Sequence, residues 1–208
     1  MDIVNPDIER YLAGLFPSTD PIVKEMERLA EREEFPIVGP LVGRLLALMA
    51  RLTNARRVFE FGSGFGYSAY WFLQGMDDRG TVVMTDDEEE NAGRARDYFK
   101  RAGLTHRVEI HVGDAFDIID QQPGPFDLIL VDCEKARYPT AFDKALPKLR
   151  SGGLLIGDNV LWSGRVLARS EEPSTIGIQQ FTRLITTDAR LTTTILPLRD
   201  GVSVSVKK

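Results

Sequence analysis

Residues 58–71 read VFEFGSGFGYSAYW and join an apolar run to a glycine-rich turn and a segment with helical character. The apolar run is typical of a strand covered on both faces, and we predict this strand over residues 56–61. Glycine allows a tight turn and lets the backbone approach a ligand closely. The helix that follows would direct the free N–H groups of its first turn at this ligand, which favours a negatively charged group there.

Beyond this stretch, predicted strands and helices alternate along the chain. The strands cover residues 81–85, 107–112, 126–132 and 152–158, and the helices cover residues 67–74, 88–102, 139–149 and 173–188. Ahead of the glycine turn, residues 21–34 and 41–52 are predicted as helices, and Asp20-Pro21 provides an N-cap and a first helical residue. Residues 191–208 form two β-rich runs around Arg199-Asp200-Gly201, which predicts a hairpin.

This alternation predicts an α/β fold of the Rossmann-like type. We expect a mostly parallel seven-stranded sheet with helices on both faces and a C-terminal antiparallel hairpin. A chain of 208 residues suits one domain with a full-sized core, so residues 1–208 are expected to form a single domain. Residues 1–35 would be its N-terminal helical segment.

Composition and charge exclude several classes of protein. The net charge is −5 and no basic stripe is present, so we expect no nucleic-acid partner. No apolar run approaches the roughly 20 residues of a membrane span, and the N-terminal residues do not read as a signal peptide. Cys133 is the only cysteine, so no intrachain disulfide can form. These features favour a cytoplasmic protein without a membrane partner.

The spacing of the glycine turn indicates the kind of ligand. Gly62, Gly64 and Gly66 give G-x-G-x-G, whereas dinucleotide sites have G-x-G-x-x-G, in which the third glycine packs the helix beside a pyrophosphate. This difference favours an adenosyl compound without a pyrophosphate. Asp86, past the next strand, can accept hydrogen bonds from ribose hydroxyls, and Asp114-Ala115, past the third, can cover an adenine ring. Each residue alone could equally serve as a turn or helix cap, but their matched positions favour a nucleoside ligand.

Oxygen-bearing side chains follow the fourth and fifth predicted strands. Asp132 ends one strand, and Asp158-Asn159 end the other. If the two strands are neighbours, these side chains converge into a site that suits Mg²⁺, Mn²⁺ or Ca²⁺. Lys135 lies on the same loop as Asp132, and a nearby cation would lower its pKa and suit it to act as a general base. On spacing alone, a helix cap at Asp132 and a turn at Asp158-Asn159 explain these residues at least as well.

Four ordered motifs resemble a known family, the cation-dependent class I O-methyltransferases, which include catechol and caffeoyl-CoA O-methyltransferases. VFEFGSGFGYSAYW is similar to their loop for S-adenosylmethionine (SAM). DLILVDCEKARYPTAF (127–142) is similar to their segment with a metal-binding aspartate and a lysine base, and GGLLIGDNVLWSGRV (152–166) to their Asp-Asn metal segment. LPLRDGVSVSVKK (196–208) resembles their closing hairpin, although Arg199 stands where many relatives have glycine. The resemblance runs from about Phe35 to the C-terminus.

The resemblance implies a role for each matched residue. Lys135 would be the catalytic base, and Asp132, Asp158 and Asn159 would hold a divalent cation, with Mg²⁺ favoured over Mn²⁺ or Ca²⁺. The expected SAM-binding residues are Val38, Glu60, Gly62, Ser63, Gly64, Gly66, Ser68, Asp86, Asp114, Ala115 and Asp132. Residues 1–35 would contribute to the acceptor pocket, and a homodimer is plausible because relatives often form one.

The expected reaction is transfer of the SAM methyl group to a metal-chelated hydroxyl of a small molecule, with S-adenosylhomocysteine (SAH) as product. A vicinal diol such as a catechol is the favoured acceptor, because two adjacent hydroxyls can chelate one cation and the cation would lower their pKa. Two alternatives stay open. One is a nicotinamide-dependent Rossmann oxidoreductase, against which the glycine spacing argues. The other is a non-catalytic SAM-binding module.

Overall fold

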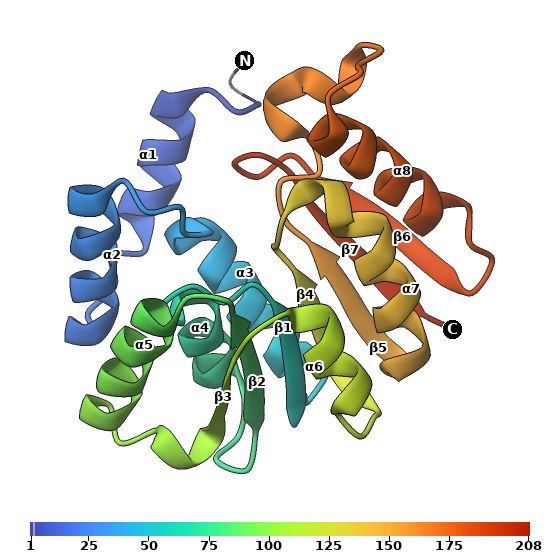
Figure 1. Ribbon diagram of the computed structural model, residues 1–208. Coiled ribbons are helices and arrows are strands. Elements are labelled where there is room, and N and C mark those ends of the chain that lie inside the picture. Colours follow the sequence, from blue (N-terminus) through green and yellow to red (C-terminus); the bar gives the residue numbers. More distant parts are fainter. Residues whose placement is uncertain (2) are drawn as a thin grey trace.

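Seven strands form one sheet in the computed structural model, which describes residues 1 and 3–208 (Figure 1). Their order is β3-β2-β1-β4-β5-β7-β6, and all neighbours are parallel except β5–β7 and β7–β6. The strands are β1 (Arg57–Phe61), β2 (Thr81–Asp86), β3 (Val108–Val112), β4 (Phe126–Val131), β5 (Leu149–Gly157), β6 (Leu191–Leu196) and β7 (Val202–Lys207). The predicted mostly parallel sheet with an antiparallel C-terminal hairpin is confirmed.

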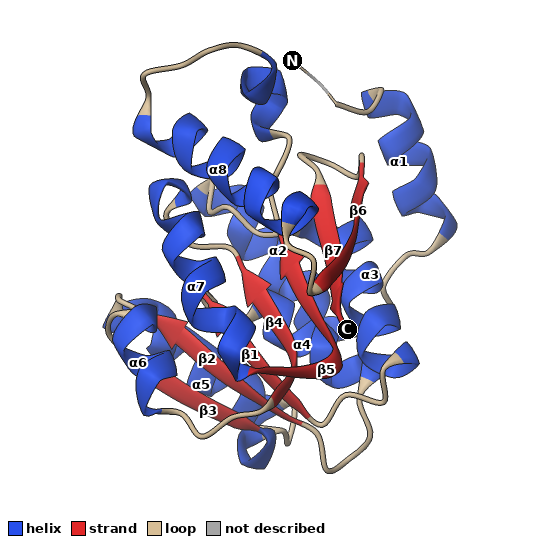
Figure 2. Ribbon diagram, turned by 90° about the vertical axis from the view of Figure 1, so that its right-hand side faces the viewer, coloured by secondary structure: helices blue, strands red, loops and turns tan. Residues whose placement is uncertain are grey.

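Helices cover both faces of the sheet, as Figures 1 and 2 show. One face packs against α3 (Gly39–Leu52), α4 (Tyr67–Gly75) and α5 (Glu89–Arg101), with α2 (Pro21–Glu33) outside them. The other face packs against α6 (Ala115–Gln121), α7 (Tyr138–Lys148) and α8 (Pro173–Thr187). Successive residues of β1 point to opposite faces of the sheet. Val58 packs on the face covered by α3, α4 and α5, and Phe59 packs on the face covered by α6, α7 and α8.

The N-terminal helices begin where the sequence supplies caps. Asp20 accepts a hydrogen bond from the Ile22 N–H at 2.8 Å, and Pro21 opens α2. In α1 (Pro6–Leu15), Asn5 caps in the same way, but none of the residues of α1 is buried. The exposed α1 stands at the edge of the molecule, next to α2 (Figure 1).

Among the strands and the helices that cover the sheet, two differ most from the sequence-based prediction. The short helix α6 was not predicted, and Asp114 is its N-cap, accepting from the Phe116 N–H at 2.8 Å. Strand β5 begins at Leu149 instead of Gly152, because Leu149 pairs with Phe126 before a register shift. Three 3-10 helices, Thr105–Arg107, Lys135–Arg137 and Trp162–Leu167, complete the described elements. None of the described helices combines the length and the hydropathy that crossing a membrane requires.

Candidate active site

Three parallel strands end side by side and place predicted site residues in one row. The register pairs the last residues of β1, β4 and β5 with one another. Gly62, Asp132 and Asp158 each follow one of these last residues. The Asp132 N–H donates to the Phe61 carbonyl at 3.0 Å, and the Asp158 N–H donates to the Val131 carbonyl at 3.1 Å. The backbone hydrogen bonds between the strands therefore continue one residue beyond the strand ends. They bring the three residues together at the carboxyl edge of the sheet, where parallel sheets bind ligands.

The turn between β1 and α4 requires glycine at two positions. Gly62 has a φ of 81°, and a Cβ atom there would lie 2.4 Å from the Asp132 carbonyl oxygen. Gly66 has a φ of 91° and caps α4, and a Cβ atom there would lie 2.8 Å from the Phe99 ring. Any other residue would be strained and crowded at either position. The backbone can therefore pass close to β4 while the first turn of α4 opens toward the strand ends.

The carboxylate of Asp86 supports the glycine turn from the end of β2. Its Oδ2 atom accepts a hydrogen bond from the Gly64 N–H at 3.0 Å. Its Oδ1 atom accepts from the Glu88 N–H at 3.0 Å and from Nδ2 of Asn91 at 2.9 Å. These bonds fix the carboxylate beside the turn.

Two adjoining cavities lie along this edge of the sheet. The inner cavity measures 460 Å³ and the side cavity 330 Å³, and both are lined by Gly62, Asp86 and Asp132. The inner cavity is also lined by the predicted residues Val38, Ser63, Gly64, Ser68, Lys135, Asp158 and Asn159. The side cavity is lined by the predicted residues Asp114 and Ala115. The fold thus gathers these residues around two adjoining cavities that share part of their walls.

Glu60 and Gly66 were also predicted as binding residues but line neither cavity. Glu60 is fully buried at the end of β1, and neither carboxylate oxygen has a hydrogen-bond partner among the described residues. Burial raises the pKa of this carboxyl to about 8, and the nearby hydroxyls of Ser68 and Ser63 offset only part of the rise. Glu60 therefore keeps its proton in most folded molecules at neutral pH.

Two carboxylates and one lysine meet at the ends of β4 and β5. Lys135 donates from Nζ to Oδ1 of Asp132 at 2.8 Å. Asp158 is 4% exposed, and its Oδ1 atom has no hydrogen-bond partner among the described residues. Burial raises the pKa of Asp158 to about 7, and repulsion from the Asp132 carboxylate adds to the rise. The site therefore has a buried acceptor atom that lacks a positively charged partner.

The chemistry of these side chains fits a small, hard cation. Within residues 1 and 3–208, no three His, Cys, Asp or Glu side chains gather into a metal site. The candidate donors are instead two carboxylates and the Asn159 amide, which lines the same cavity. All three can present oxygen atoms, the donors that Mg²⁺, Mn²⁺ and Ca²⁺ prefer. A cation bound here would supply the partner that Oδ1 of Asp158 lacks.

Among the lining residues that were not predicted, Arg137 and Tyr67 make polar contacts through their side chains. Arg137 lines the side cavity, donates to Oδ2 of Asp114 at 2.9 Å and stacks 3.7 Å from the centre of the Phe116 ring. Tyr67 lines the inner cavity, and its hydroxyl donates to Oε1 of Glu27 at 2.7 Å. Tyr67 directly follows the glycine turn, so its place could have been inferred. The contacts of Arg137 depend on α6, which the sequence did not reveal.

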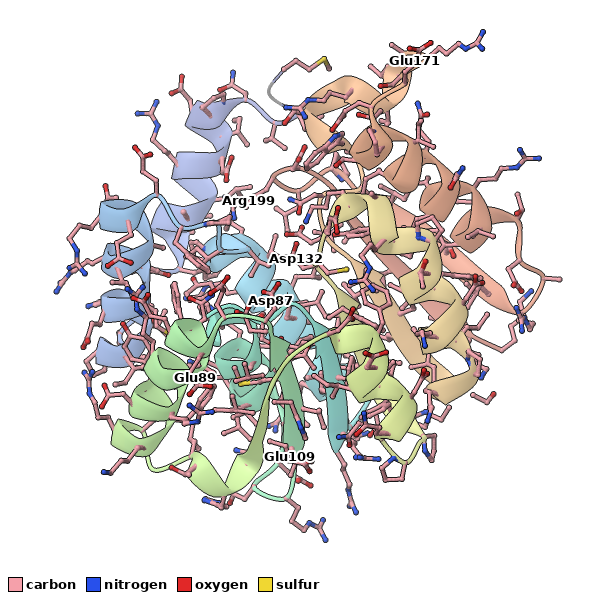
Figure 3. The ribbon with its side chains drawn as sticks, viewed as in Figure 1. Asp87, Glu89, Glu109, Asp132, Glu171 and Arg199 are labelled. Carbon is pink, nitrogen blue, oxygen red and sulfur yellow. The ribbon has the colours of Figure 1, made fainter. Side chains whose placement is uncertain are left out.

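An outer cavity of 740 Å³ adjoins the inner one and shares Asp158 and Asn159 with it. Its walls come from α1, α2, the segment 35–40 and the β6–β7 turn. In Figure 3, Asp132 lies at the strand ends, and Arg199 lies between Asp132 and the blue helices. The N-terminal segment, in which no motif was matched, thus forms a wall of the space next to the candidate metal donors.

Comparisons with known proteins agree with this geometry. A family model described as O-methyltransferase matches residues 18–208. The catechol O-methyltransferase of Niastella koreensis is 31% identical over 97% of this chain and 96% of its own. The O-methyltransferase from Bacillus cereus, solved in complex with SAH, has a TM-score of 0.88 at 31% identity and covers 97% of each chain. TomG from Streptomyces achromogenes, solved in complex with SAM, has a TM-score of 0.89 at 28% identity over 97% of this chain and 96% of that one.

The comparisons and the fold lead to the same family. The matched region includes the glycine turn, the Asp132 and Lys135 segment, and the Asp158-Asn159 segment. The relatives cover nearly the whole chain, so the similarity is not confined to a shared nucleotide-binding motif. The chain belongs to the class I SAM-dependent O-methyltransferases.

Proposed function

We propose that this enzyme methylates one hydroxyl of a small vicinal diol, such as a catechol, while a divalent cation chelates both hydroxyls. The observation that carries the proposal is the row of Asp132 and Asp158 at the ends of β4 and β5. There, Lys135 lies 2.8 Å from Asp132, and Oδ1 of Asp158 lacks a partner. The catechol O-methyltransferase similarity supports the same acceptor class.

In this proposal SAM extends through the inner and side cavities. Its methionine end lies against the glycine turn and the first turn of α4, where Ser68 and the backbone of Val38 line the space. Asp86 would bind its ribose, and Asp114 and Ala115 would hold its adenine at the side cavity, which all three residues line. Glu60 is proposed to act indirectly, from behind the glycine turn, because its side chain lines neither cavity.

Asp132, Asp158 and Asn159 would hold the cation, with Mg²⁺ favoured over Mn²⁺ or Ca²⁺. A phenolic hydroxyl has a pKa of about 10, and a bound divalent cation stabilises the phenolate and lowers this pKa. Backbone hydrogen bonds to the neighbouring strands anchor Asp132 and Asp158, so their carboxylates would orient a chelated diol relative to SAM. Such alignment matters because methyl transfer needs the oxygen in line behind the methyl group.

Lys135 is proposed to accept the hydroxyl proton at Nζ. Its side chain is 15% exposed and already points into the site, because it pairs with Asp132. Nζ therefore lies beside a proposed cation-binding carboxylate, where a general base for a chelated hydroxyl is needed.

Residues 1–208 are proposed to act as one methyltransferase domain, in which the N-terminal helices form a wall of the acceptor space.

We also propose a homodimer. Ile8, Tyr11 and Leu15 are exposed on α1, and Phe16 is exposed directly after it. These apolar side chains could be covered by a second copy of the chain. Light scattering during gel filtration of wild type and Tyr11→Glu tests this: a dimer that becomes a monomer is expected, and a monomeric wild type refutes it.

The two alternative functions are less well supported. A nicotinamide-dependent oxidoreductase is not favoured, because the family match and the SAM- and SAH-bound neighbours all concern methyl transfer. A non-catalytic SAM-binding module would have no need for Lys135 beside two carboxylates. Such a module would bind SAM and release no SAH with any acceptor.

The variant Asp158→Ala tests the proposal most simply. We expect at least a 100-fold loss of catechol methylation, because the acceptor loses one of its cation-binding carboxylates. SAM affinity measured by calorimetry should change by less than about threefold, since Asp158 lies at the acceptor end of the inner cavity. Asp143→Ala, on the outer side of α7, is the matched control and should behave as wild type. Wild-type turnover by Asp158→Ala would refute the metal role.

A further inference from the structure

Arg199 occupies a strained backbone position at the β6–β7 turn. Its φ is 49°, in the left-handed region that residues with a Cβ atom adopt at a cost. Glu34, Asn159, Trp162 and Ser163 share this conformation, and all four line the inner or outer cavity. Strained backbone is thus concentrated around the acceptor space, and at Arg199 it directs a long side chain into that space.

The Arg199 side chain joins three separate segments. Its Nη1 atom donates to the Ile37 carbonyl at 2.6 Å, in the segment between α2 and α3. Its Nε atom lies 3.6 Å from Oε1 of Glu9, on α1. The guanidinium also rests on Gly39, where a Cβ atom would lie only 2.6 Å from Nη1. The side chain therefore bridges the β6–β7 turn, α1 and the loop before α3.

This bridge lies in the wall of the outer cavity. Arg199, Glu9, Ile37 and Gly39 all line it, together with the candidate metal donors Asp158 and Asn159. Figure 3 shows Arg199 on the path from the N-terminal helices toward Asp132. A substituent on a diol bound at Asp158 would extend into this cavity and meet the guanidinium.

The charge around Arg199 indicates a steric role and not a binding site for an anion. Six acidic side chains line the outer cavity, whereas Arg199 is the single basic side chain among the described lining residues. The acidic set is Glu9, Glu27, Glu31, Glu34, Asp158 and Asp200. An anionic acceptor would be repelled by this wall, and the charge of Arg199 is already offset by Glu9.

We propose that Arg199 is a specificity-determining residue, whose bridge holds the wall of the outer cavity in place and so limits the size of the substituents that a bound diol can carry. This inference rests on the proposed function. A lysine at this position could not form the whole bridge. Its ammonium is a compact point charge, whereas the planar guanidinium of arginine contacts the Ile37 carbonyl and Glu9 at the same time.

The test compares R199G, R199K and wild type with catechol and with 4-tert-butylcatechol. R199G removes the bridge and relieves the backbone strain, so the variant is expected to fold. For R199G, we expect the ratio of kcat/KM for the bulky diol to kcat/KM for catechol to rise at least tenfold, mainly through a lower KM for the bulky diol. R199K should be intermediate. R169G, which removes an exposed arginine that lines none of the three cavities, is the matched control and should keep the wild-type ratio.

A second readout needs no acceptor. Hydrogen–deuterium exchange over residues 6–15 and 35–40 should be faster in R199G than in wild type, because α1 and the loop lose their common anchor. An unchanged ratio in an active R199G, or unchanged exchange over both segments, overturns the proposal. If wild type methylates neither diol, the proposed function fails, and the exchange comparison alone then supports or overturns the bridge.

Discussion

Replacing Glu60 with glutamine should change how the stability of the ligand-free protein depends on pH. Glu60 is fully buried, and burial raises its pKa from an ordinary 4.5 to about 8. Between these two values the folded protein retains a proton that the unfolded chain has released. Stability contributed by this proton is therefore lost as pH rises toward 8, and the loss is complete above that value. Glutamine is neutral at every pH and has nearly the same shape.

The size of the effect follows from the pKa. At about 1.4 kcal/mol per pKa unit, a rise from 4.5 to about 8 corresponds to an upper limit of roughly 5 kcal/mol. Relaxation around the ionised carboxylate reduces this, so we expect about 2–4 kcal/mol at pH 9. Glu60→Gln should be similar to wild type at pH 5 and more stable than wild type at pH 9. Asp158 also has a raised pKa and acts in the same direction, so the variant's profile should be flatter but not level.

Urea unfolding followed by circular dichroism, at several values between pH 5 and pH 9, measures the difference. Glu109→Gln, at an exposed position on β3, is the control and should follow the wild-type profile. Parallel profiles for wild type and Glu60→Gln would refute the reasoning, because they would mean that Glu60 does not change its ionisation on folding.

Four further predictions concern the site. Lys135→Met should lower kcat for catechol by roughly 10²–10⁴-fold in steady-state assays, because the proposed base is lost, while the KM for SAM stays close to wild type. Gly62→Ala should destabilise the protein by about 1–3 kcal/mol in thermal unfolding and weaken SAM binding, since its Cβ would meet the Asp132 carbonyl oxygen. Arg137→Ala should weaken SAM binding about 3- to 10-fold in calorimetry, because the wall at Asp114 loses its ion pair. Mg²⁺ affinity should rise between pH 6 and pH 8, because the cation needs Asp158 ionised and its pKa is about 7 without metal.

The sheet and the row of site residues could be predicted because both depend on local patterns. Apolar runs at β1 and β4 are long enough to be recognised as buried strands, and parallel strands end at the same edge. Once β4 and β5 are neighbours, Asp132 and Asp158 must converge. The register that pairs Val131 with Gly157 shows this directly.

The features that could not be predicted depend on contacts between distant residues. The helix α6 has only seven residues, too few for a clear helical period, and it is stabilised where Phe116 packs 5.2 Å from the ring centre of Phe61. The early start of β5 at Leu149 depends on its pairing with Phe126. The reach of Arg199 across the outer cavity to Glu9, on α1, has no local signal at all.

The most direct test of the central claim is SAH release by wild-type enzyme from SAM and catechol, with added Mg²⁺ and, in parallel, with excess chelator. The two carboxylates at Asp132 and Asp158 predict release that requires both the diol and the cation, and that stops when chelator is added. Equal release in the presence of chelator would contradict the account, because the diol would then be activated without a cation.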